Sequence, residues 1–235
     1  MRIRHLTACA AALVALPALA GAQGKVQKTT RIPTPRARLA SECTWKPADA
    51  WVKRQAEFFD ESRHDWTNDS LRNALLDAAG LKAPLKIPVQ FGVRVEGADS
   101  TPPASAEAMV DALKKLASTR GSTWPTRSVV GAAGTNAVYL LVGLDTMLAK
   151  TALHRMMEAG PAESPAADVA TLEDRLRLLA GRKQIYGTQF RRAGDGKVEL
   201  APMEDSAHAD LRREGAALPP FKLGLCMAGA GKGKV

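Results

Sequence analysis

The sequence predicts a mainly α fold in a single globular domain, with about six helices and one small β-hairpin. Apolar residues recur at helical spacing through most of residues 47–214, and Asn, Asp and Ser stand where helices would start. Strand-like alternation of apolar and polar residues is confined to residues 87–95 and 184–201. A few short strands among many helices indicate a helical domain that carries a small β element.

Two helices are expected before the first strand. The first covers residues 47–63, because Pro47 fits the first turn of a helix. The second covers residues 68–80, where Asn68 or Asp69 can cap the start and Gly80 suits a left-handed end.

A strand is expected at residues 87–95, and Pro88 confines it to a sheet edge or a strand start. Ser105 is expected to cap an amphipathic helix that ends at Gly121. The glycines of residues 131–134 predict a turn. The segment 137–144 that follows is apolar on every side, so it is expected in the middle of the domain.

The remaining elements are two helices, a hairpin and a last helix, expected at residues 145–160, 164–180, 184–201 and 206–214. Asp145 and Ser164 are the expected N-caps of the two helices. The Gly194-Asp195-Gly196 run predicts the hairpin turn. Pro219-Pro220 is expected to end the ordered core.

The chain divides into four expected parts. Residues 1–22 have the basic start, apolar run and small-residue cleavage site of a signal peptide, which predicts export to the periplasm or medium. Residues 23–40 form a basic, Pro-rich linker, residues 41–221 the globular domain, and residues 222–235 a flexible Gly/Lys tail. A lipoprotein signal at Cys9 is the alternative, but Cys9 precedes most of the apolar run. No later segment is long enough for a membrane span.

The formal charge of +9 resides at the ends of the chain. Seven of the 33 basic residues precede residue 39 and three follow residue 221, which leaves 23 basic against 24 acidic residues in between. A nucleic-acid groove needs basic residues on the domain surface, so nucleic acid is not an expected partner. The basic ends suit contact with an anionic cell envelope.

Two cysteines remain after removal of the signal peptide. In an oxidising compartment Cys43 and Cys226 are expected to form a disulfide, and two unpaired thiols are the alternative. The three remaining histidines, His64, His154 and His208, have no metal-ligand spacing, so neither a metal nor a cofactor is expected. Neither a nucleophile elbow nor a phosphate-binding loop occurs in the sequence.

The most informative stretch lies around Gly181, where a helix gives way to an amide- and hydroxyl-rich strand. Asp174-Arg175, Gln184 and Tyr186-Gly187-Thr188-Gln189 resemble the signature of a bacterial domain family of unknown function. The likeness extends to Trp124-Pro125 upstream and to Asp210-x-Arg212-Arg213 downstream, over roughly residues 106–221. The resemblance implies no activity, cofactor or catalytic residue. The chain departs from the pattern at Thr123, where the family has Gly, and at Gly143-Leu144, where it has Gln-His.

The clustered polar residues predict a cleft for a small polar ligand or a peptide. The candidate ligand-binding residues are Trp124, Asp174, Arg175, Gln184, Tyr186, Thr188 and Gln189. A hydrolase that uses Asp174 as general acid or base is the second hypothesis, although no nucleophile–base pair is evident. The third is a structural envelope module in which the polar residues only hold the hairpin in place.

Overall fold

The computed structural model describes Cys43, Lys46 and residues 49–83, 94–95, 104–194 and 197–229. These residues belong to one compact unit. The expected signal peptide, the expected linker and most of the expected strand at residues 87–95 lie outside the described residues.

The described part of the chain is mainly helical with a small antiparallel hairpin, which confirms the predicted fold class. Its α-helices are α2 (Ala50–Phe58), α3 (Asp69–Ala78), α4 (Ala104–Ser118), α5 (Arg127–Val142), α6 (Thr146–Ala159), α7 (Ala166–Leu179), α8 (Ala209–Gly215) and α9 (Phe221–Ala228). Two short 3₁₀ helices are η1 (Glu61–Arg63) and η2 (Ser206–His208). The strands are β1 (Arg94–Val95), β2 (Gln189–Arg192) and β3 (Val198–Leu200).

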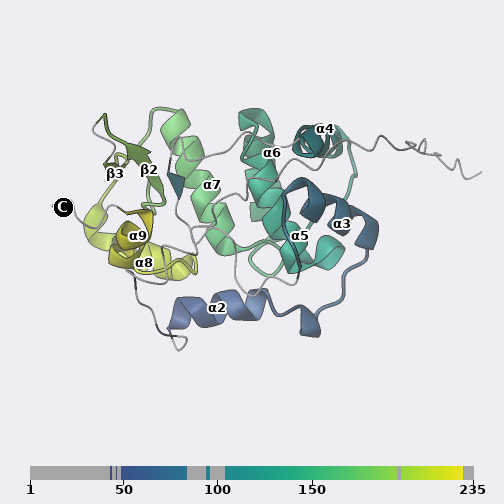
Figure 1. The fold of residues 1–235 in the computed structure, drawn as a ribbon, viewed down its shortest axis with the longest axis horizontal. Helices are drawn as coiled ribbons and strands as arrows, with labels where there is room; N and C mark the ends of the chain where they lie inside the picture. Colours follow the sequence, from purple (N-terminus) through teal and green to yellow (C-terminus); the bar gives the residue numbers. More distant parts are fainter. Residues whose placement is uncertain are drawn as a thin grey trace, which may run out of the picture. The chain divides into compact units, whose positions relative to one another are not determined.

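Helix α5 forms the centre of the main hydrophobic core, as the apolar segment at residues 137–144 predicts. It contacts α3, α4, α6 and α7, which lie around it in Figure 1. Leu75 of α3, Leu113 of α4, Val142 of α5 and Leu172 of α7 are buried in one cluster. This core fixes the position of α7, which carries Asp174.

The predicted turn at residues 131–134 is confirmed only at Gly131: α5 begins at Arg127, is interrupted at Gly131 and resumes at residue 132. Gly131 alone leaves the helical conformation, with φ 69°. Glu61 stabilises the helix beyond this kink: its Oε1 accepts the backbone N–H of Ala133 at 3.0 Å. The second carboxylate oxygen of Glu61 pairs with Arg72 at 2.8 Å. A carboxylate far away in sequence therefore caps the part of α5 that resumes after Gly131.

Helix starts follow the predicted caps in part. Asn68 accepts the N–H of Leu71, and Asp145 accepts that of Leu148, as expected. Ser105 instead lies inside α4, and α7 begins after Pro165 without a side-chain cap. The helix expected at residues 47–63 is divided into α2 and η1 by Phe59 and Asp60.

The sheet has the order β1-β2-β3. β2 and β3 form the antiparallel hairpin, with Phe190 opposite Leu200. β1 pairs in parallel with β2, and Arg94 lies opposite Gln189. The hairpin therefore receives a third strand from a segment that precedes four of the core helices.

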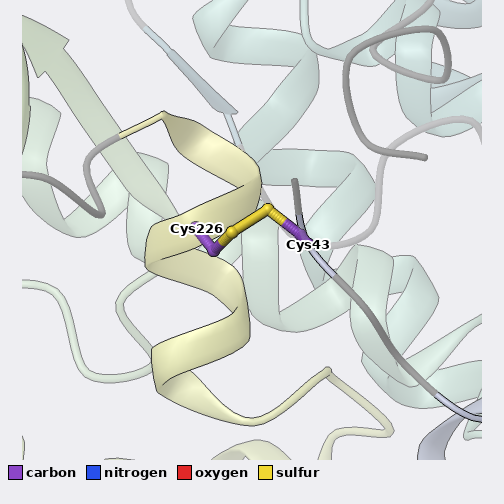
Figure 2. Close-up of a disulfide and its surroundings, with 2 residues drawn as sticks. All are labelled: Cys43 and Cys226. Carbon is purple, nitrogen blue, oxygen red and sulfur yellow. A yellow bond between two sulfur atoms is a disulfide. The ribbon is translucent and has the colours of Figure 1, made fainter. Parts of the chain in front are cut away.

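The C-terminal boundary lies later than predicted. Residues 222–228 were expected in a flexible tail after Pro219-Pro220, but they belong to helix α9. A disulfide joins Cys226 of α9 to Cys43, with a Cα–Cα distance of 5.9 Å across 183 residues of sequence (Figure 2). The pairing of two cysteines 183 residues apart and the apolar face of α9 hold this segment against the domain. Among the described helices, none is long and apolar enough to cross a membrane.

Candidate functional site

The Asp174 carboxylate organises the loop between α7 and β2. Asp174 is fully buried. Its oxygens accept the backbone N–H groups of Ile185 at 2.7 Å, Tyr186 at 3.0 Å and Thr188 at 3.1 Å. The Thr188 hydroxyl donates to the same carboxylate at 2.8 Å. Several donors around one carboxylate make charge-assisted bonds that fix the path of the loop.

Gly187 allows the loop to turn beneath this carboxylate. Its φ is +71°, a conformation that strongly favours glycine. A Cβ at this position would lie 2.6 Å from Cε2 of the Phe221 ring. Both the backbone conformation and the close approach of α9 therefore require glycine here.

Gln184 joins the two sides of the hairpin. Its Nε2 donates to the carbonyl oxygens of Gln189 at 3.0 Å and Ala201 at 2.9 Å. Its Oε1 accepts the backbone N–H of Gln189 at 2.9 Å. The Gln189 side chain in turn donates to the Thr171 carbonyl of α7 at 3.0 Å. The two amides therefore tie the hairpin to itself and to α7.

Arg213, whose role the sequence did not reveal, completes the junction. It is fully buried, and it donates to the carbonyl oxygens of Tyr186, Gly187 and Pro219. Desolvation lowers the pKa of Arg213 to about 10, and the nearby Asp174 carboxylate opposes this shift. Arg213 thus remains charged at neutral pH. It binds carbonyl oxygens of the loop, while Asp174 binds the loop's N–H groups.

Four of the seven candidate residues therefore meet, but they meet inside the protein. Asp174, Gln184, Thr188 and Gln189 are all buried and bonded to neighbouring groups. A general acid or base needs an oxygen that can reach a substrate. The enclosed Asp174 carboxylate offers none in this conformation, so its surroundings favour a structural role.

Arg175 and Trp124 lie apart from this junction. The Arg175 guanidinium donates to the carbonyl oxygen of Gly143 at the end of α5. Trp124 is buried in the helical core together with Leu172 and Leu176. Among the seven candidates, Tyr186 alone lines either of the two hollows described next.

The concave surface beside Tyr186, which we call the first hollow, has a volume of about 390 Å³. It lies between the end of α6, the start of α7 and α8, and its lining is mostly apolar. The lining residues are Met156, Met157, Gly160, Pro161, Ser164, Ala166, Val169, Ala170, Tyr186, Arg212, Gly215 and Ala216. A smaller hollow, the second hollow, has a volume of about 160 Å³ and is lined by Arg54, Gln55, Phe58, Pro161, Pro165, Ala166, Gly215 and Ala217.

Tyr186 is one of three polar side chains that line the first hollow, with Ser164 and Arg212. The side chain is half-buried, and its hydroxyl makes no hydrogen bond with the described residues. Burial raises the pKa of the Tyr186 hydroxyl, and the charge of Glu173 adds to this effect. The hydroxyl therefore remains protonated at neutral pH and can donate a hydrogen bond to a ligand.

Comparisons with known proteins give no match: no family model, no curated protein and no solved structure is similar to this chain. The described residues contain no group of three His, Cys, Asp or Glu side chains that could hold a metal ion.

A second buried carboxyl group, that of Asp168, lies in the first turn of α7. Asp168 is 1% exposed and accepts a hydrogen bond from Asn136 of α5 at 3.3 Å. Desolvation raises the pKa of Asp168 to about 8, against the weaker opposing effect of the Asn136 hydrogen bond. The group lines neither of the two hollows, and its raised pKa bears on the stability of the fold.

Proposed function

We propose that this domain is a binding module that holds a peptide segment by an apolar side chain in the first hollow. The polar junction around Asp174 serves as the support of that surface and does not itself contact the ligand. The observation that carries the proposal is the position of Tyr186, whose backbone is fixed by Asp174 and Arg213 while its ring lines the hollow.

The composition of the first hollow suits this role. Ligand sites are concave and mostly apolar, with a few fixed polar groups that orient the ligand. The neighbouring Met156 and Met157 provide flexible, polarisable walls that adapt to different apolar side chains. The rigid Tyr186 loop and the adaptable methionines together favour recognition of a side chain over chemistry on it.

We further propose where the protein resides and to which family it is related. We infer export from the signal-like residues 1–22, and the Cys43–Cys226 bond is typical of an oxidising compartment. We also infer kinship with the bacterial domain family that the motif resembles, because Asp174, Gln184, Thr188 and Gln189 act as one structural unit. The basic ends favour a place near an anionic envelope.

The test is to select binders from a phage-displayed library of random peptides with the purified mature protein, and to measure their affinity by calorimetry. Met157→Glu puts a charge on the wall of the first hollow and is expected to weaken binding by about tenfold or more. Met147→Glu is the matched control, because Met147 is also exposed on α6 but does not line the hollow. The proposal is contradicted if the selected peptides bind both variants equally, or if the library yields no binder. Either result favours the hypothesis of a purely structural module.

A further inference from the structure

The two hollows are neighbours, and we call them together the groove. Pro161, Ala166 and Gly215 line both of them. Together their linings reach from Met157 and Tyr186, past the start of α7, to Arg54 and Phe58 of α2. A ligand that occupies both hollows must be longer than one side chain.

The charged side chains that line the groove are all basic. They are Arg54 and Arg212, and no Asp or Glu belongs to the lining of either hollow. Arg212 is already paired with Asp205 and bonded to the carbonyl oxygens of Ile185, Glu204 and Asp205. Its charge and donors are therefore largely committed within the domain.

Arg54 is the basic group that remains available. It is exposed, and its Nη2 donates to the backbone carbonyl oxygen of Glu214. Among the described residues it has no carboxylate partner. The carbonyl bond positions the guanidinium at the edge of the second hollow, with donors left for a ligand.

Gln55 is the other polar side chain that lines the second hollow. It is 4% exposed, and its Nε2 donates to the Ala217 carbonyl oxygen at 2.9 Å. Its Oε1 is buried without a hydrogen-bond partner among the described residues. Leaving a buried acceptor unpaired costs free energy, which a ligand N–H that reaches this oxygen would recover.

We infer that the groove takes an acidic peptide segment, with an apolar side chain in the first hollow and a carboxylate paired with Arg54 at the second. A main-chain N–H of the segment serves the unpaired oxygen of Gln55. This inference rests on the proposed function. It adds the charge of the ligand and which part of it lies in each hollow. A fatty acid has the apolar chain and the carboxylate but lacks the N–H donor, so the groove favours a peptide.

The first readout is the composition of the selected peptides. An excess of Asp and Glu beside the apolar residue is expected, and an excess of Lys and Arg contradicts the inference. The best acidic peptide is then compared with its partner in which each Asp or Glu is replaced by Asn or Gln. The acidic form is expected to bind about tenfold more tightly at low salt, and the difference is expected to shrink as salt rises.

The second readout is a double-mutant cycle. Arg54→Gln is expected to remove the preference for the acidic peptide and to leave the affinity of the neutral one almost unchanged. Arg54→Lys keeps the charge and is expected to retain part of the preference. Lys53→Gln is the control, because this neighbouring exposed cation does not line the groove.

The outcomes separate the two proposals. Loss of binding in Met157→Glu together with equal affinity for acidic and neutral peptides overturns the charge inference and leaves the binding module intact. Absence of any peptide binder overturns both. Displacement of a bound acidic peptide by laurate at submicellar concentration, with laurate binding more tightly than the peptide, identifies a fatty-acid site and also overturns the peptide assignment.

Discussion

The Asp174 carboxylate accepts both donors of Thr188, the backbone N–H at 3.1 Å and the side-chain hydroxyl at 2.8 Å. Two bonds to one residue hold the loop in a single position relative to α7. The N–H groups of Ile185 and Tyr186 add to this anchor. The loop that presents Tyr186 is therefore part of the folded framework.

Asp174→Asn is expected to lower the free energy of unfolding by about 3 kcal/mol, because the loss of charge weakens several bonds and the new NH₂ group faces N–H donors. Urea denaturation measures this change. Asp111→Asn is the control, since the Asp111 side chain is 78% exposed. A change below about 0.5 kcal/mol in Asp174→Asn contradicts the structural role of the carboxylate.

Gly187→Ala tests the close approach between the loop and α9. Gly181 also has a positive φ, but the space around it is open. Gly181→Ala is therefore expected to cost about 1 kcal/mol from backbone strain alone. Gly187→Ala is expected to cost clearly more, because its Cβ meets the Phe221 ring. Thermal unfolding measures both losses of stability. If the two variants lose the same amount, the contact with Phe221 adds nothing to the cost of Gly187→Ala.

Removing the Cys43–Cys226 bond by the double variant Cys43→Ser/Cys226→Ser is expected to cost roughly 5 kcal/mol in the chain-entropy model. The reason is the long loop of 183 residues that the bond closes in the unfolded chain. Urea midpoints measured with and without a dithiol reductant test this prediction. Reductant should lower the urea midpoint of the wild type and leave that of the double variant unchanged. A wild-type midpoint that reductant does not change contradicts the presence of the disulfide.

Because Asp168 has a raised pKa in the folded protein, we expect the free energy of unfolding to fall as pH rises. Its folded-state pKa of about 8 lies above the ordinary value of 3.8. Between these two values the folded protein keeps a proton that the unfolded chain has released, so the free energy of unfolding falls with pH and levels off above the folded-state pKa. The expected contribution is about 1.4 kcal/mol per pH unit within this window.

Asp168→Asn supplies the control for this pH dependence. Asparagine can still accept the hydrogen bond from Asn136 but does not titrate, so the variant should be more stable at neutral pH than the wild type. Urea unfolding from about pH 5 to about pH 8 should give a flatter profile in Asp168→Asn. Parallel pH profiles for the two proteins would show that Asp168 is not the source of the pH dependence of stability.

Local patterns predicted the helices well where local groups decide them. Asn68 and Asp145 cap their helices through residues three positions away, which the sequence displays directly. The glycines indicated the break at Gly131 but not that helix resumes directly after it, because Glu61 caps the resumed helix from far away in sequence. Helix α9 was missed because its attachment depends on the distant Cys43.

The sequence indicated that Asp174, Gln184, Thr188 and Gln189 lie close together, but not that all four are buried. On an isolated helix Asp174 lies opposite the apolar stripe of α7, which indicates a solvated residue. The loop at residues 185–188 covers it, and the covering is a tertiary contact that helical periodicity does not encode. Arg175 points about 100° away from Asp174 around the same helix, and it therefore binds Gly143 at the other side.

The disulfide of Cys43 and Cys226 also sets how the domain responds to mechanical load. A pull applied to the chain before residue 43 and after residue 226 passes through the sulfur–sulfur link. The polypeptide between the two cysteines then bears almost none of the tension. A protein tethered at both ends would keep its groove folded under forces that extend an unbridged chain.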